Sequence, residues 1–340
     1  MKYLITGITG FAGPHLAQLL LRHGHEVHGI VRTPNGRQND LLDIISPEEL
    51  GRLNFHHLDL KHFYGINKLL QKEKFDGVFH LAAQSHPPTS FVDPILTFDE
   101  NVKGSINLIT SLEKSNTKFM FCSTSEVYGD SCKHTGVLTT KDPLSPSNPY
   151  GASKAAIDLY MQERMRNGFL KGFVTRAFSH TGPRRGFNFS ISSDAYQIAK
   201  MKLGLQPKTL QVGNLETERV VIDVRDCVNA YYLLMQSDEA TGHVFNVCGE
   251  DVHKMQYFTD LLVRSAGFVP EDIIQEINPD FYRPIDIDIQ IGDCSTLRNL
   301  TGWKPEIPIE VTMGDLLEYW LKKFQNSIKK KKKNGNPTLF

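Results

Sequence analysis

Three glycines near the start of the chain constrain the fold more than any other feature of the sequence. Residues 3–5 are strand-forming, Gly7, Gly10 and Gly13 follow them, and residues 14–22 place leucines at helical spacing. Glycines at these spacings allow a tight turn, and the helix that follows points its N–H groups and positive dipole end at a phosphate. An ordinary glycine-containing turn is the alternative, but the strand–turn–helix context favours a dinucleotide-binding loop. The expected contacts come from Gly7, Thr9, Gly10, Phe11 and Gly13.

Short apolar runs alternate with helical patterns through the first half of the chain. Strands are expected at residues 26–31, 54–57, 78–82, 118–122 and 172–175, with helices between them. This alternation predicts an α/β fold of the Rossmann type, a doubly wound parallel sheet with helices on both faces. After Phe178 the period is lost, and a smaller C-terminal substrate-binding domain is expected. The predicted boundaries are 1–178 for the dinucleotide-binding domain, to which later strands return, 179–328 for the substrate-binding portion, and 329–340 for a flexible lysine-rich tail.

The composition limits the classes of partner. Thirty-eight basic residues balance thirty-eight acidic ones, yet five of the lysines are consecutive at 329–333. Without them acidic residues outnumber basic ones, which disfavours a nucleic-acid-binding protein. No apolar run approaches the ~20 residues that span a bilayer, no signal sequence precedes the first strand, and the five scattered cysteines form no metal or disulfide pattern. We therefore expect a cytoplasmic protein that binds neither membranes nor nucleic acids.

The end of the second predicted strand indicates which dinucleotide binds. NAD enzymes usually carry Asp or Glu here for the ribose 2′-hydroxyl, whereas an arginine accommodates the 2′-phosphate of NADP. This strand ends at Arg32, with Arg37 nearby and no carboxylate, so NADP is the predicted cofactor. Asp59, after the third strand, is a candidate partner for the adenine amino group, and the alternative is that it caps a helix.

A tyrosine and a lysine four residues apart suggest redox chemistry. On a helix, Tyr150 and Lys154 share one face. A tyrosine hydroxyl has an ordinary pKa of ~10, so nearby positive charge must lower it before it can act as a base at neutral pH. Such pairs also occur by chance on surfaces, but this one follows the glycine motif and the Ser-Thr-Ser-Glu run at 123–126. We therefore predict that Tyr150 and Lys154 are catalytic.

In these motifs the chain resembles the extended short-chain dehydrogenase/reductase family, and within it the GDP-mannose 4,6-dehydratases. The resemblance covers nearly the whole chain. It rests on the three glycines, the Tyr150/Lys154 pair, His-Leu-Ala-Ala-Gln at 80–84, Ser-Thr-Ser-Glu-Val-Tyr-Gly at 123–129, Pro-Arg-Arg-Gly at 183–186, Gly-Asn-Leu at 213–215, Tyr-Arg-Pro at 282–284 and Gly-Trp-Lys-Pro at 302–305. The resemblance implies a homodimer or homotetramer that binds NADP and a GDP-sugar.

The same resemblance implies roles for individual residues. Tyr150 would take the proton of the sugar 4-hydroxyl while hydride passes from C4 to NADP, with Thr124 bonding the 4-oxygen and Lys154 the nicotinamide ribose. Glu126 would remove the C5 proton and help expel the 6-hydroxyl as water, before hydride returns to C6 and a 4-keto-6-deoxy sugar forms. Further cofactor contacts are expected from Leu60, Leu81, Ala82, Ala83, His180 and Arg185, besides Arg32 and Asp59. Substrate contacts are expected from Ser85, His86, Ser125, Ser179, Asn188, Arg219 and Arg283, the two arginines through the diphosphate.

Departures from the family pattern leave alternatives open. Ser179 stands where the family often has Asn, and residues 189–194 lack the usual Arg-Lys pair. The substrate is thus GDP-mannose, a close GDP-sugar such as GDP-manno-heptose, or a sugar on another nucleotide. A GDP-4-keto-6-deoxymannose reductase shares much of the pattern but needs no base at C5, so Thr124 with Glu126 favours the dehydratase. A non-catalytic NADP-binding sensor is a third alternative, and the retained Tyr150 and Lys154 argue against it.

Overall fold

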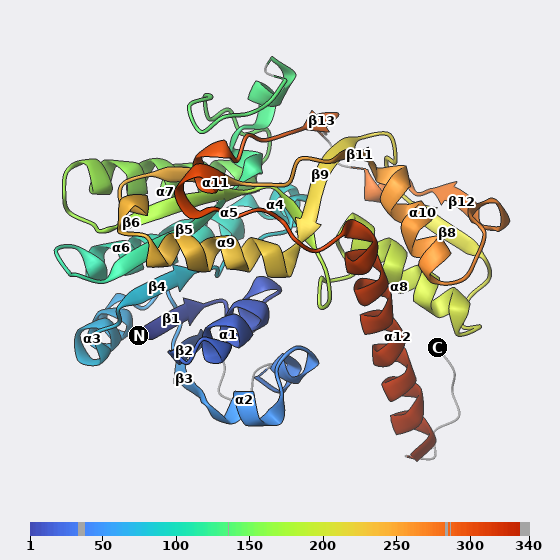
Figure 1. Ribbon diagram of the computed structural model, residues 1–340, viewed down its shortest axis with the longest axis horizontal. Coiled ribbons are helices and arrows are strands. Elements are labelled where there is room, and N and C mark those ends of the chain that lie inside the picture. The colour runs from blue at the N-terminus through green and yellow to red at the C-terminus, as the bar shows by residue number, and fades with distance from the viewer. Residues whose placement is uncertain (33–37, 135, 283–284, 286, 334–340) are drawn as a thin grey trace.

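A seven-stranded parallel sheet forms the centre of the computed structural model, which describes residues 1–32, 38–134, 136–282, 285 and 287–333 (Figure 1). The strand order is β10-β6-β5-β4-β1-β2-β3, and it reverses between β1 and β4. A crevice therefore opens at the carboxyl ends of these two strands, the usual ligand position in such sheets. All six strands predicted from the sequence are confirmed. The seven strands of the sheet are β1 (Lys2–Thr6), β2 (Glu26–Val31), β3 (Leu53–His57), β4 (Gly77–His80), β5 (Lys118–Thr124), β6 (Gly172–Ala177) and β10 (Val244–Val247), of which only β10 was not predicted.

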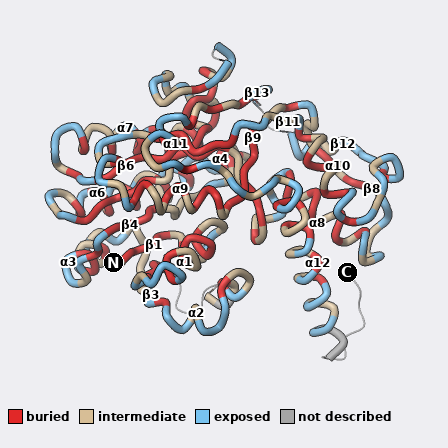
Figure 2. Tube along the Cα trace, in the orientation of Figure 1, coloured by how far each residue is buried: buried red, intermediate tan, exposed pale blue. Residues whose placement is uncertain are grey.

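Helices cover both faces of this sheet, as the Rossmann-type prediction requires. Because successive strand residues point to opposite faces, each strand contributes to two cores. Tyr3 and Phe79 pack on one face with α1 (Ala12–Arg22) and α9 (Val224–Gln236). Leu4 and Val78 pack on the other face with helices α3 (Phe63–Glu73), α6 (Gly104–Leu112) and α7 (Pro149–Arg166). The central strands are consequently buried along most of their length (Figure 2).

Short helices fill the connections of this lobe. They are α2 (Pro47–Gly51), α4 (Pro87–Val92) and α5 (Pro94–Phe98). A π-helical turn, Asp99–Lys103, joins α5 to α6. Such turns are rare in helices and often occur beside functional sites.

A second, smaller lobe is formed by parts of the chain after β6 and lies beside the sheet, to which α9, β10 and α11 (Ser295–Thr301) return (Figure 1). Its core joins α8, α10 and α12 through apolar side chains such as Ile198, Phe258 and Leu316. Two small sheets accompany these helices, one with the order β11-β9-β13 and β7 paired to β9, the other pairing β12 with β8. The elements of this lobe are β7 (Ser179–Thr181), α8 (Ser190–Lys202), β8 (Thr209–Val212), β9 (Glu218–Asp223), β11 (Val252–Lys254), α10 (Met255–Ser265), β12 (Ile274–Ile277), β13 (Ile289–Gln290) and α12 (Ile309–Lys333).

The lysine run is helical where the structure describes it, which differs from the predicted flexible tail beginning at residue 329. Helix α12 continues to Lys333 and projects from the second lobe (Figure 1). Lysine has a good helix propensity, so the helix extends past the end of its apolar stripe. Within the described ranges, no helix is both long and apolar enough to cross a membrane.

Candidate active site

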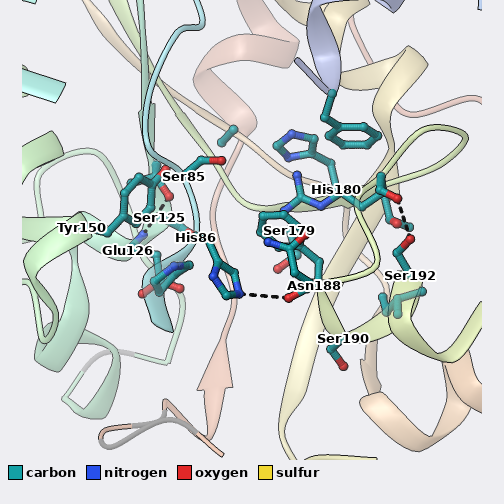
Figure 3. A pocket seen from close by; sticks show the side chains of 18 of the residues that line it. Ser85, His86, Ser125, Glu126, Tyr150, Ser179, His180, Asn188, Ser190 and Ser192 are labelled. Atoms are coloured by element: carbon teal, nitrogen blue, oxygen red, sulfur yellow. Dashed lines mark hydrogen bonds between the residues drawn. The ribbon is translucent and has the colours of Figure 1, made fainter. Parts of the chain in front are cut away.

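A cavity of about 730 Å³ lies where the carboxyl ends of β1, β4, β5 and β6 face the second lobe. Sheet residues and second-lobe residues both line it, so neither lobe forms the site alone. Glu126, Tyr150 and Ser125 lie on one side of the cavity, and Ser190 and Ser192 of α8 lie on the opposite side (Figure 3). The cavity therefore reaches from the end of β5 to the start of α8.

The predicted glycine loop lies at the start of α1, against the loop after β4. Gly7 has a φ of 73°, and a Cβ atom there would approach the backbone nitrogen of Ala82 to 2.8 Å. A Cβ atom on Gly13 would lie 2.4 Å from the carbonyl oxygen of Gly7. The loop is therefore packed so closely that only glycine fits, and its amide groups remain at the start of the helix for a phosphate.

Arg184 braces this loop from the second lobe. Its Nε donates to the carbonyl oxygen of Gly10 at 2.9 Å and its Nη2 to that of Thr9 at 2.7 Å. Thr9 is a predicted cofactor contact, but it is absent from the described residues that line the cavity. The other four residues predicted in the loop line the cavity, together with the predicted contacts Leu81, Ala82 and Ala83.

Tyr150 and Lys154 enter the cavity from the first two turns of α7, and both are buried. Lys154 Nζ lies 4.2 Å from the centre of the Phe121 ring, and among the described residues no acceptor hydrogen-bonds to it. Burial lowers the pKa of Lys154 to about 8. Burial also raises the pKa of Tyr150, and a hydrogen bond with Thr124 and the charge of Arg185 offset only part of this effect. In the protein by itself, burial therefore outweighs the neighbouring positive charge at Tyr150.

Glu126 follows the end of β5, directly beside these groups. The Glu126 backbone N–H donates to Thr124 Oγ1 at 3.3 Å, and the carboxylate Oε2 accepts a hydrogen bond from Asn148 Nδ2 at 2.7 Å. Ser125 Oγ donates to Gln290 Oε1 of β13 at 2.9 Å. The structure therefore brings a carboxylate, a hydroxyl and the Tyr150 phenol into one cavity, the groups that a proton transfer to and from a sugar needs.

The predicted sugar-pocket residues come from two separate loops. His86 Nε2 lies 3.0 Å from the carbonyl oxygen of Asn188, a contact drawn in Figure 3. Ser85 and Ser179 line the cavity beside them. This contact links the loop after β4 to the segment before α8, although about a hundred residues separate the two in the chain.

Arg185 places a buried guanidinium in the same cavity. Its centre lies 4.7 Å from the Phe11 ring and 3.5 Å from the Phe189 ring, and no described residue accepts a hydrogen bond from it. Burial lowers the pKa of Arg185 to about 10, so it stays charged at neutral pH. His180 stacks on Phe11, and burial lowers its pKa to about 4. Of Arg185 and His180, only Arg185 is therefore charged at neutral pH, and its positive charge suits a bound phosphate.

Several predicted contacts lie outside the cavity or have other partners. Arg32 Nη1 donates to Glu100 Oε2 at 2.8 Å, and Asp59 Oδ1 accepts from the backbone of Lys61 at 2.8 Å. Neither residue, nor Leu60, is among the described residues that line the cavity. The alternative reading of Asp59 as a helix cap is incorrect, because α3 begins at Phe63 with His62 before it.

The two arginines predicted for the diphosphate differ in outcome. Arg219 lines the cavity, but its guanidinium donates to the backbone carbonyls of Glu218, Ile287 and Asp288 at 2.8, 2.5 and 3.1 Å. It therefore supports the segment before β13 as well as facing the cavity. Arg283 lies outside the described residues.

Sequence reasoning missed residues that hold the site together. Asn148 caps α7 and binds Glu126, and the Asn-Pro pair before Tyr150 is a helix-start signal that points to it. Asn101, in the π-helical turn, accepts from Gln84 N at 2.7 Å and donates to Ser153 of α7 at 2.9 Å. Gln290 reaches Ser125 from far along the chain, and no local pattern signals such a contact.

Comparisons with known proteins identify the family of the chain. The chain is 33% identical over 322 residues to a GDP-6-deoxy-D-mannose reductase of Pseudomonas aeruginosa, covering 94% of this chain and 97% of that one. It is 31% identical to GDP-mannose 4,6 dehydratase 1 of Arabidopsis thaliana, covering 90% of this chain and 86% of that one. The solved structure of RMD from Pseudomonas aeruginosa complexed with NADPH superposes with a TM-score of 0.78 at 29% identity, covering 95% of this chain and 100% of that chain. A family model described as GDP-mannose 4,6 dehydratase matches residues 4–316, from β1 into α12, so the chain belongs to this family of short-chain dehydrogenase/reductase enzymes.

Proposed function

We propose that the protein is an NADP-dependent GDP-sugar 4,6-dehydratase that converts GDP-mannose, or a close GDP-sugar such as GDP-manno-heptose, to the 4-keto-6-deoxy sugar. One observation carries the proposal: the Glu126 carboxylate lies in the same cavity as Thr124 and Tyr150. A sugar oxidised at C4 becomes acidic at C5, and a carboxylate at that position can remove the C5 proton.

The residues present fit a bound NADP. The close-packed glycine loop suits the pyrophosphate, and Lys154 and Arg185 are cations without a hydrogen-bonded acceptor among the described residues. A bound NADP would supply the acceptor for the hydride of C4 and the donor of hydride to C6, and its positively charged ring would add to the cations beside Tyr150.

The chain's own residues supply the proton transfers. Tyr150 takes the proton of the 4-hydroxyl, with Thr124 hydrogen-bonded to the phenol, and a 4-ketone forms. Glu126 then takes the C5 proton and gives it to the departing 6-hydroxyl, which leaves as water. C5 takes up one proton again when hydride reaches C6. This proton balances the one that Tyr150 removed from the 4-hydroxyl, so the sugar loses one water and nothing else.

A reductase acting on GDP-4-keto-6-deoxymannose is the second candidate. The Pseudomonas aeruginosa relative has a reductase name, and the first turn of α8, Ser190 to Asp194, carries none of the cations that the dehydratase pattern places there. A reductase uses Tyr150 and Lys154 but requires no carboxylate at Glu126.

We infer a homo-oligomer that works in the cytoplasm. Helices α4 to α7 expose apolar side chains, with Val92 at 87% and Ile95 at 83% of full exposure, and Ile106 and Leu159 also exposed. Exposed apolar groups on neighbouring helices are typical of an interface between subunits. Sedimentation of the purified protein tests this: a monomer at working concentration contradicts it.

Mass spectrometry of the products tests the proposed function. The protein is incubated with GDP-mannose and a catalytic amount of NADP⁺. Loss of one water from the sugar nucleotide without a build-up of NADPH is the expected result. A second incubation contains GDP-4-keto-6-deoxymannose and NADPH. Consumption of this substrate, with no change in GDP-mannose in the first incubation, would instead establish the reductase. If neither substrate reacts, GDP-manno-heptose is tested next.

A further inference from the structure

Asn148 uses both ends of its side-chain amide, and each end holds a different part of the site. Its Oδ1 accepts a hydrogen bond from the backbone N–H of Gly151 at 2.7 Å and so caps α7. Its Nδ2 donates to Glu126 Oε2 at 2.7 Å. The residue is buried, and it is absent from the described residues that line the cavity. It therefore acts on the cavity only through its two partners.

Those two partners carry the groups that handle protons in the proposed reaction. Tyr150 and Lys154 lie in the first two turns of the capped helix, and Glu126 belongs to the loop after β5. The helix also touches this loop directly, because a Cβ atom on Gly151 would come 2.7 Å from the Glu126 carbonyl oxygen. One amide thus connects the carboxylate to the helix that carries the tyrosine.

We propose that Asn148 is a positioning residue that holds the Glu126 carboxylate at a fixed place and orientation relative to Tyr150. This inference rests on the proposed dehydratase function, since only that reaction uses both groups on one sugar. The tyrosine must reach O4 and the carboxylate must reach the hydrogen on C5, one carbon away. A shared anchor keeps these two distances correct together, whereas independent anchors would let the carboxylate rotate away.

A purely structural cap is the competing explanation, and two substitutions separate the two roles. Asparagine, aspartate and serine are comparable helix caps, so Asn148→Asp and Asn148→Ser both keep the bond to Gly151. Aspartate has the same shape but replaces the donating amide with a negatively charged oxygen facing Glu126. Serine is too short to reach the carboxylate. A matched control is Asn167→Asp at the other end of α7, where Asn167 Nδ2 also donates to a glutamate, Glu163, at 2.6 Å but on the surface.

The experiment measures turnover, KM, thermal stability and the reduced nicotinamide present during turnover. We expect kcat to fall roughly 10²-fold in Asn148→Asp and about tenfold in Asn148→Ser, with KM and the melting temperature unchanged. Because C4 oxidation continues while C5 deprotonation slows, reduced nicotinamide should accumulate in both variants but in neither wild type nor Asn167→Asp.

Each outcome has one meaning. Unchanged kcat in both Asn148 variants, or a fall in kcat that matches a fall in melting temperature, overturns the positioning role. A fall in kcat without accumulated reduced nicotinamide also overturns it, because the slowed step is then not the one that Glu126 performs. If the wild-type protein releases no water from any GDP-sugar tested, the proposed function fails first and the inference falls with it.

Discussion

The sheet lobe and the second lobe face the same cavity, but they hold their side chains there by different means. In the sheet lobe the site depends on short-range backbone packing: Gly13 against Gly7, and Gly151 against Glu126. In the second lobe it depends on contacts between distant segments, such as Arg219 with the carbonyls of Ile287 and Asp288. In the first arrangement an added Cβ atom would meet backbone atoms, whereas the second rests on the hydrogen bonds of one side chain. We therefore expect changes in the glycine loop to affect the cofactor site, and changes in the second lobe to affect mainly its own contacts.

Removing the hydroxyl of Tyr150, a residue of the sheet lobe, has the largest expected effect on activity. Tyr150→Phe should lower hydride transfer roughly 10²- to 10⁴-fold, because the sugar loses its proton acceptor. The measurement is the rate of nicotinamide reduction on mixing with substrate, with Tyr160→Phe on the same helix as the control. A rate within a few-fold of wild type would remove Tyr150 from the mechanism.

A buried acid in the second lobe should make stability depend on pH. Burial raises the pKa of Asp194 to about 7, and a hydrogen bond from Thr259 opposes this only in part. Since an unfolded aspartate titrates near ~3.9, the folded protein binds the extra proton, and stability falls by about 1.4 kcal/mol for each pH unit between those two pKa values. Asp194→Asn should therefore be more stable than wild type above pH ~7, with the advantage shrinking toward pH ~4.

Denaturant unfolding at several pH values measures this, with Asp260→Asn on α10 as the control. A constant difference between Asp194→Asn and wild type across the pH range would contradict the buried-acid assignment. Stability should change in this variant without a comparable change in NADP affinity, and a large loss of NADP binding would break the division between the lobes.

A substitution in the glycine loop should instead weaken NADPH binding. In Gly13→Ala the new Cβ atom would lie 2.4 Å from the Gly7 carbonyl, so the loop must move. NADPH affinity should fall about tenfold or more, which corresponds to about 1.4 kcal/mol. Fluorescence titration with NADPH measures it. Gly51→Ala is the control, because a Cβ atom there meets nothing within 4 Å, and equal affinities for the two variants would show that the loop does not hold the cofactor.

The sheet lobe was predictable from sequence because its signals are local. Strand runs, the glycine spacing and the Tyr150/Lys154 pair each lie within a few residues, and the strands and the loop were placed correctly. Asp59 and Arg32 have protein partners, Lys61 and Glu100, that the motif does not consider, and their contacts with a cofactor stay predictions. For the second lobe, the sequence showed only that the strand–helix alternation ends after Phe178. Its contacts join distant segments, as Gln290 and Ser125 do across 165 positions, and no local pattern predicts them.

The most direct test of the central claim is whether C5 of the sugar exchanges its hydrogen with solvent during turnover. The protein converts GDP-mannose in heavy water with catalytic NADP⁺, and the position of deuterium in the product is read by NMR. Deuterium at C5 of a 4-keto-6-deoxy product, lost together with turnover in Glu126→Gln, is the predicted result. Turnover that leaves C5 unlabelled, or full dehydratase activity in Glu126→Gln, would contradict the assignment of Glu126 as the C5 base.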